Sequence, residues 1–119
     1  MATLTLTSVD VEGLADAEEM RHAMAAAHRA LRTGSAVQPR PDALPVGVDG
    51  TADAPAVVPM SALSEELGLF AVKVLADAPR NRAAGLPAQR STVVLFDATT
   101  AECVAIVDGR ALTRIRTAA

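Results

Sequence analysis

Five short stretches of the chain have the residue pattern of β-strands. The first, Thr3–Thr7, alternates as TLTLT and therefore has one apolar face. The other four are rich in apolar and β-branched residues and lie between segments that favour turns. They are Ala56–Met60, Leu69–Leu75, Thr92–Phe96 and Cys103–Val107, and the last two predict a hairpin.

A second spacing of apolar residues, three or four positions apart, predicts one long helix over Asp16–Thr33. Its apolar stripe consists of Met20, Ala23, Met24, Ala27 and Leu31. Asp16, with Glu19 three residues later, is placed to cap the start of this helix. Gly34 is placed to end it in a left-handed conformation.

Two shorter helices are also expected. Val9–Leu14 is a brief helix that Ser8 can cap. The Asp108-Gly109 turn leads into a helix over residues 110–119, which contains neither a glycine cap nor a proline stop.

Two segments are expected to be loops. Ser35–Pro55 contains four prolines and two glycines, and Asp77–Gln89 is basic and includes a tight Gly85-Leu86-Pro87 turn. The polar segment Ser61–Leu67 is expected to connect two strands. Together these elements predict an α+β fold: a single domain over residues 1–119, with a mixed or antiparallel sheet of about five to six strands and the long helix packed on one face.

Composition excludes several classes of function. The net charge of −3 gives no support to nucleic-acid binding, and no stretch approaches the roughly 20 apolar residues of a membrane span. The first ten residues lack the features of a signal peptide. Cys103 is the only cysteine, which predicts a buried thiol in a reducing cytoplasm. His22 and His28 are six residues apart, a spacing that favours solvated histidines and no metal site.

The apolar half of the chain consists mostly of small side chains. Alanine accounts for 26 residues, and Phe70 and Phe96 are the only aromatic residues. Because large aliphatic and aromatic side chains supply most of the free energy of burial, such a core stabilises the fold only weakly. We therefore expect the chain to need a partner that covers exposed edges of the sheet.

Lys73 is a cation in the middle of an apolar strand. Alternation places it on the same face as Leu69, Ala71 and Leu75, where a buried ammonium group is costly unless an anion meets it. An anion-binding site is one explanation. The other is an edge strand, in which a lysine prevents sheets from pairing with one another.

Several segments in the second half of the chain also form a recognisable series. In order, they are VKV around Lys73, APRNRAAGLP, VVLFDATT, AIVDGRALT and the terminal TRIRTAA. In order and spacing this series resembles the ornithine cyclodeaminase and mu-crystallin family. One such segment is a weak signal, but five in order over about fifty residues are fairly specific.

The resemblance implies a substrate-binding role for three cations. Lys73 and Arg116, the arginine of RTAA, would bind the carboxylate of a small amino or keto acid. Arg40, in VQPRP, corresponds to a proline–arginine pair of the family and would have the same role. A solvated loop arginine explains Arg40 equally well, because the following residues look like an insertion.

The chain departs from the family pattern at three positions. The family usually has glycine where Ser91 and Ala101 stand, and threonine or serine where Ala88 stands. The hydroxyl group at the last of these positions helps to hold substrate in the family. Its replacement by alanine leaves the identity of the substrate open.

The reaction implied by the resemblance is the NAD-dependent conversion of L-ornithine to L-proline and ammonia, or a related imine reduction or amino-acid dehydrogenation. NAD(H) or NADP(H) is the implied cofactor of a full-length member. No G-x-G-x-x-G motif is found in these 119 residues. The expectation is thus a truncated substrate-binding and dimerisation domain, without the Rossmann domain, catalytic residues or activity of its own. Members of the family pair such sheets across a two-fold axis, so the resemblance also implies a homodimer. The alternative is a short, non-enzymatic module that dimerises or binds an amino or keto acid.

Overall fold

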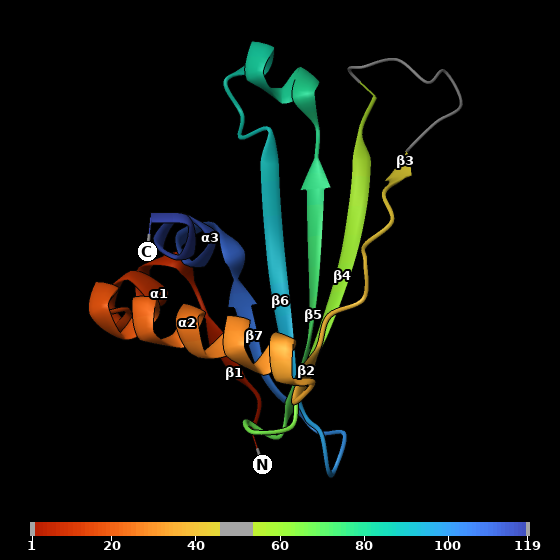
Figure 1. Ribbon diagram of the computed structural model, residues 1–119. Helices are drawn as coiled ribbons and strands as arrows, with labels where there is room; N and C mark the ends of the chain where they lie inside the picture. Colours follow the sequence, from red (N-terminus) through yellow and green to blue (C-terminus); the bar gives the residue numbers. More distant parts are fainter. Residues whose placement is uncertain (1, 46–53, 119) are drawn as a thin grey trace.

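The computed structural model describes residues 2–45 and 54–118, which form an α+β fold (Figure 1). Its strands are β1 (Leu4–Leu6), β2 (Ala36–Val37), β3 (Leu44–Pro45), β4 (Ala56–Ser64), β5 (Leu69–Asp77), β6 (Gln89–Asp97) and β7 (Cys103–Asp108). Its helices are α1 (Ser8–Leu14), α2 (Ala17–Thr33), the 3-10 helix η1 (Pro79–Ala84) and α3 (Gly109–Ala118). The predicted fold class is confirmed.

The described strands form one mixed sheet of seven strands, in the order β1-β7-β6-β5-β4-β2, with β3 also paired to β4. Only β1 and β7 are parallel among these pairs. The prediction of about five to six strands was low because β2 and β3 lie inside the segment expected to be a loop. Each has two residues, and each forms by pairing with β4, which local sequence does not reveal.

β4 is longer than predicted. It continues through Ser64, so the polar connection expected over Ser61–Leu67 is reduced to a tight turn between β4 and β5. Nine consecutive residue pairs join these two strands, from Ala56 opposite Asp77 to Ser64 opposite Leu69. The ladder to β5 thus holds Ser61 and Ser64 in a strand despite their polarity.

The predicted caps of α2 are confirmed, and that of α1 was wrong by one residue. Asp16 accepts hydrogen bonds from the backbone N–H groups of the first turn, and Gly34 ends α2 with a φ of 86°. At α1 the cap is Thr7, whose hydroxyl accepts from the Asp10 N–H while the Asp10 carboxylate accepts from the Thr7 N–H. Ser8 is not the cap because its hydroxyl donates to Asp108 instead.

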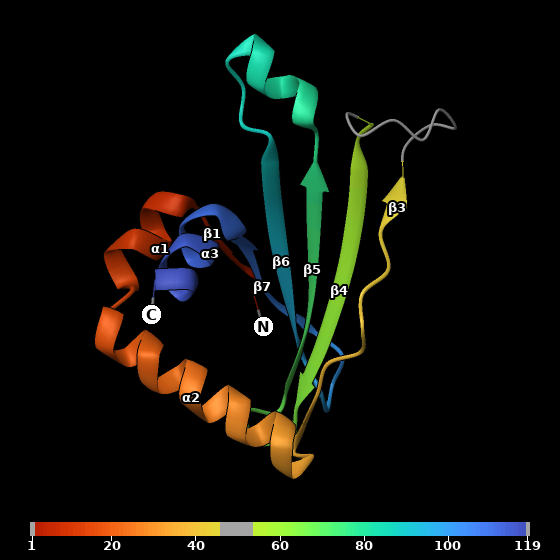
Figure 2. The ribbon, with the colours of Figure 1, turned by 45° about the horizontal axis from the view of Figure 1, so that its top comes forward.

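The three α-helices lie on one side of the sheet (Figures 1 and 2). The buried core is located beneath α1 and α3, not beneath the longer α2. It comprises Val11, Val93, Ala105, Val107 and Ala111. Ala30 is the only buried residue of α2, so that helix lies over the sheet without packing closely against it.

On the opposite side, the sheet presents an apolar surface that no helix of the described part covers. Phe70 of β5 and Phe96 of β6 stack there, with their ring centroids 4.5 Å apart. Val74 and Ile106, on the same face, are 41% and 38% exposed. We call this surface the open face.

The loop between β5 and β6 has the predicted turn. Gly85 ends η1 with a φ of 74°, and the Leu86 N–H donates to the Asn81 carbonyl. The Asn81 side-chain amide donates to the Pro87 carbonyl at 3.0 Å. The glycine and the asparagine therefore shape this connection together.

Several predictions from composition can also be compared with the structure. A buried thiol was expected at Cys103, but the residue is half-buried because it lies where β7 begins. His22 and His28 are exposed, and the described residues contain no group of side chains placed to hold a metal ion. None of the described helices is long and apolar enough to cross a membrane.

Candidate functional site

Lys73 lies at the centre of the sheet, on the face that the helices cover. β5 is paired along its length with β4 and β6, and Lys73 stands between Met60 and Val93 in the register. β5 is therefore not an edge strand, and the explanation of Lys73 as a residue that blocks edge pairing was wrong. The ammonium group instead projects toward α3, where its Nζ donates to the Thr113 hydroxyl at 3.0 Å.

The surroundings of Lys73 disfavour its charged form. The side chain is half-buried, and the resulting desolvation lowers the pKa of Lys73 below its ordinary value of 10.5. The positive charge of Arg116 lowers this pKa further. Among the described residues the Thr113 hydroxyl is its one hydrogen-bond partner, so two of the three ammonium donors remain for water or a ligand. An anion at this position would relieve both effects.

Arg116 lies on α3, one turn beyond Thr113, and lines the same cavity as Lys73. The cavity has a volume of about 360 Å³ and lies between α2, α3 and the strands β4 and β5. Its remaining lining residues are Met24, Ala27, His28, Leu31, Gln38, Met60, Ser61, Ala62 and Ala71. We call this space the cation cavity.

The cation cavity has the chemistry of a carboxylate site. Lys73 and Arg116 both line it, and its lining residues include neither aspartate nor glutamate. A carboxylate placed between these two cations would accept charge-assisted hydrogen bonds, each worth roughly 1.5–3 kcal/mol. Apolar residues around half-buried Lys73 lower the local polarity there and strengthen its bond to a carboxylate, whereas Arg116 is exposed.

The sequence did not foresee every residue of the cavity. Thr113 is three residues before Arg116, so the two share a helix face, and that spacing is the signal that could have identified it. His28 and Gln38 line the cavity from α2 and from the segment after β2. Arg40, two residues beyond Gln38, is exposed and is not among the lining residues. The substrate-binding role expected for Arg40 therefore stays a prediction without geometric support.

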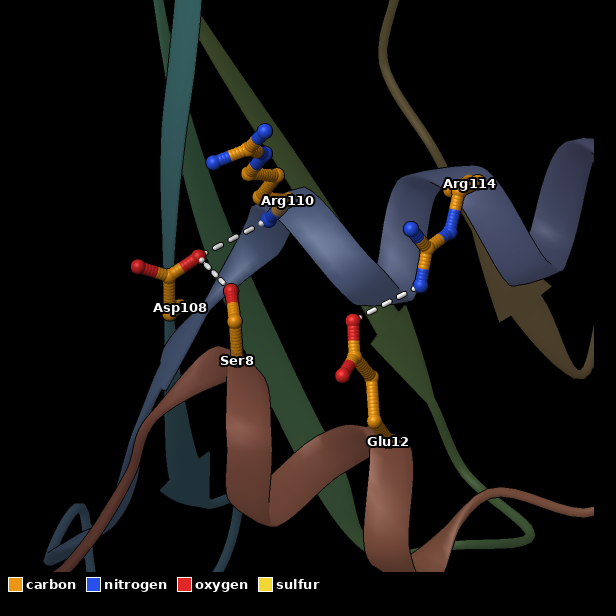
Figure 3. Close-up of polar contacts among 5 residues, drawn as sticks. All are labelled: Ser8, Glu12, Asp108, Arg110 and Arg114. Carbon is orange, nitrogen blue, oxygen red and sulfur yellow. Dashed lines mark hydrogen bonds and ion pairs between the residues drawn. The ribbon is translucent and has the colours of Figure 1, made fainter.

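Polar contacts between α1 and α3 fix the helix that carries Arg116 (Figure 3). One carboxylate oxygen of Asp108 accepts from the Ser8 hydroxyl at 2.8 Å and from the Arg110 backbone N–H at 2.9 Å. These bonds lower the pKa of Asp108 below its ordinary value of 3.8. One turn further along α3, Arg114 forms an ion pair with Glu12 of α1 at 2.7 Å. Arg114 therefore connects α3 to α1.

The start of α3 lies very close to β6. Gly109 is buried, and a Cβ atom at this position would lie 2.0 Å from the Ser91 hydroxyl oxygen. A glycine is therefore required at Gly109 for α3 to begin at this distance from the sheet. This close approach places Thr113, about one turn after Gly109, within hydrogen-bond distance of Lys73.

Solved structures with the same fold include enzymes of amino-acid and imino-acid chemistry. Thermococcus litoralis Δ1-pyrroline-2-carboxylate reductase, determined with NADH and L-proline, has a TM-score of 0.86 and 27% identity over 97% of this chain and 34% of its own. An archaeal alanine dehydrogenase dimer with bound NAD has a TM-score of 0.85 and 27% identity, over 98% and 34% of the two chains. A probable ornithine cyclodeaminase from Bordetella pertussis shares the fold, with a TM-score of 0.77 and 22% identity over 98% and 33%.

These alignments show that the chain spans about a third of the length of the solved relatives. In the comparison with curated protein sequences, none matches significantly. The profile of the ornithine cyclodeaminase/mu-crystallin family matches residues 1–119, which is the whole chain. The chain therefore belongs to the ornithine cyclodeaminase/mu-crystallin family.

Proposed function

We propose that this chain is the substrate-binding part of an NAD(P)-dependent enzyme that acts on a small amino, imino or keto acid. Lys73 and Arg116 bind the carboxylate of that acid. The observation that carries the proposal is that both cations line one cavity, whose lining contains no carboxylate. Membership of the family supports it, because relatives were determined with NAD or NADH and one of them with L-proline.

The proposed reaction is oxidation or reduction at the carbon that bears the amino or imino group. Conversion of L-ornithine to L-proline and ammonia is one form of this chemistry, and imine reduction is another. In either form the chain's contribution is to orient the substrate: two cations from different elements hold the carboxylate, so the neighbouring carbon has a defined position. NAD(P) supplies the hydride chemistry when bound.

The described residues do not themselves fit a dinucleotide. A dinucleotide fold needs parallel strands joined by a helix, with a glycine-rich turn at the helix start. Here the described strand pairs are antiparallel except for β1 and β7, which are at opposite ends of the chain. The two glycines that come nearest to the spacing of such a glycine-rich turn are Gly47 and Gly50, and they lie outside the described residues. We therefore assign no cofactor contacts and no hydride-transfer step to this chain.

Calorimetric titration of the 119-residue chain with pyruvate and with L-proline tests the carboxylate site. Lys73→Met and Arg116→Gln remove one charge each, and each is expected to weaken binding on the order of tenfold to a hundredfold. Arg82→Gln is the matched control, because Arg82 is exposed on η1 and does not line the cavity. Equal affinity in the wild type and both cavity variants would refute the proposed role.

Activity is tested separately. With NAD and L-ornithine, the 119-residue chain is expected to form no L-proline, since we assign it no cofactor-binding residues. Detection of L-proline above a blank without protein would contradict this expectation.

We also propose that two copies associate through the open face. Val74 and Ile106 leave aliphatic side chains in water there, and burying exposed apolar area favours association. A non-enzymatic dimerising module would use the same surface, so dimerisation alone does not identify an enzyme. Light scattering tests the association: Val74→Lys is expected to shift the chain toward monomer, whereas Val9→Lys, on exposed α1, leaves it unchanged. A wild-type monomer at high concentration would contradict the proposal.

A further inference from the structure

The cation cavity adjoins a second cavity between α2 and the sheet. This second cavity has a volume of about 340 Å³. Five residues line both spaces: Ala27, Leu31, Gln38, Ala62 and Ala71. A molecule whose carboxylate lies between Lys73 and Arg116 therefore has an adjoining space into which its other end can extend. We call the second cavity the apolar chamber.

The lining of the apolar chamber is almost entirely aliphatic. From α2 it is lined by alanines and one leucine, and from the sheet by leucines and alanines. Its polar lining residues are Gln38, Ser64 and Glu66. Glu66 lies in the turn between β4 and β5 and is exposed, so its carboxylate remains solvated. The interior of the chamber thus has no charged partner for a ligand.

The chamber exists because of the composition of α2. Ala23, Ala26 and Ala30 face it, and their single methyl groups do not reach across to β4 and β5. Larger residues at these positions would fill the space, as close packing does in most protein interiors. Alanine retains helix propensity while leaving a cavity, and a cavity lined in this way favours apolar groups over water.

We propose that the substrate is an amino, imino or keto acid with an unbranched or branched aliphatic side chain, which the apolar chamber binds. This inference rests on the proposed function, because it requires the carboxylate to lie at Lys73 and Arg116. The acid has a charged head in the cation cavity and an uncharged tail of several carbon atoms beneath α2. A tail that ends in an ammonium group, as in ornithine, would lose its hydration in the chamber without gaining a buried carboxylate.

A series of 2-oxo acids of increasing length tests the chamber: pyruvate, 2-oxobutanoate, 2-oxopentanoate, 2-oxohexanoate and 2-oxooctanoate, titrated into the 119-residue chain. Each added methylene is expected to strengthen binding by about fourfold, which is the fold-change equivalent of ~0.8 kcal/mol per buried CH₂ group. The quantity compared between variants is the ratio of the 2-oxohexanoate affinity to the pyruvate affinity, so each variant is its own reference.

The matched pair of variants is Ala26→Leu and Ala25→Leu. Ala26 lines the chamber, whereas its neighbour Ala25 is exposed and does not. Ala26→Leu is expected to reduce the chain-length ratio to near one, and Ala25→Leu to leave it at the wild-type value. Circular dichroism confirms folding in both, and Ala23→Leu gives a second test from another position of the chamber.

The outcomes separate this inference from the proposed function. Binding that depends on Lys73 but does not increase with chain length overturns the tail site and leaves the carboxylate site intact. Binding that is the same in Lys73→Met overturns the carboxylate site, and the inference with it. Tighter binding of L-ornithine than of L-norvaline, which has the same three side-chain carbons without the amine, would indicate that a cationic tail is accepted near Glu66, and would also overturn the inference.

Discussion

Gly109→Ala adds one methyl group, and this substitution is expected both to destabilise the chain and to weaken ligand binding. The Cβ atom would lie 2.0 Å from the Ser91 hydroxyl oxygen, 3.0 Å from the Ser91 Cβ and 3.1 Å from the Ser91 carbonyl oxygen. Rotation of the Ser91 side chain can remove the first contact. The other two involve atoms fixed by β6, so α3 must move away from the sheet at its first residue.

The cost follows from the size of this displacement. Insertion of a methyl group into a packed site costs typically about 1–3 kcal/mol. For a domain of this length, each kcal/mol lowers Tm by roughly 4 °C, so a decrease of about 4–12 °C is expected. Because α3 also carries Thr113 and Arg116, its displacement should weaken the carboxylate site as well. A decrease in Tm together with weaker pyruvate binding is therefore the combined signature.

Thermal and urea unfolding, followed by circular dichroism, measure the effect. Gly13→Ala is the matched control, since a Cβ at Gly13 in α1 would meet no atom within 4 Å, and it is expected to be neutral or slightly stabilising. Ser91→Gly removes the hydroxyl group and the Cβ, so it should recover part of the loss when combined with Gly109→Ala. A Gly109→Ala chain as stable as the wild type would refute the argument from close approach.

Three further predictions concern single residues. Ala101 has a left-handed φ of 63°, a conformation that favours glycine. Ala101→Gly should therefore raise the free energy of unfolding, measured in urea, by about 0.5–1 kcal/mol, once the greater chain entropy of glycine in the unfolded state is subtracted. A decrease would contradict this. The lowered pKa of Asp108 contributes stability above pH 3.8 that is lost as pH falls through the folded-state value, so Asp108→Asn should lose less stability between pH 5 and 2 than the wild type. Because bound carboxylate favours charged Lys73, and the pKa of Lys73 is below 10.5, affinity for pyruvate should fall as pH rises toward 10.5, and this alkaline decrease should be absent from Lys73→Met.

The sequence predicts most of the elements that local chemistry determines. The helix of Asp16–Thr33 has a side-chain cap at one end and a glycine at the other, and both operate within one turn of the helix terminus. The strand around Lys73 was also predicted, together with the face that its side chain occupies. In these cases the information lies within a few residues.

Features that depend on distant partners could not be predicted in the same way. Ser61 and Ser64 are polar, yet they continue β4 because β5 pairs with them. Ser8 is well suited to cap a helix, but Asp108, one hundred residues away in the chain, engages its hydroxyl. Arg116 was located through family resemblance, whereas the hydrogen bond between Lys73 and Thr113 depends on how α3 lies over β5.

The parallel pairing of β1 with β7 has a consequence for how the chain folds during synthesis. Leu4 pairs opposite Ala105 and Leu6 opposite Val107, so β1 cannot pair until β7, about one hundred residues later in the chain, has left the ribosome. Closing a loop of about one hundred residues is entropically costly and slow compared with the β4–β5 hairpin. The hairpins around β5 can therefore form early, while the segment from β1 to α1 remains unpaired until β7 is available. Until then Val11 cannot pack against Ala105 and Val107, and the nascent chain exposes apolar surface to chaperones and to other copies of itself.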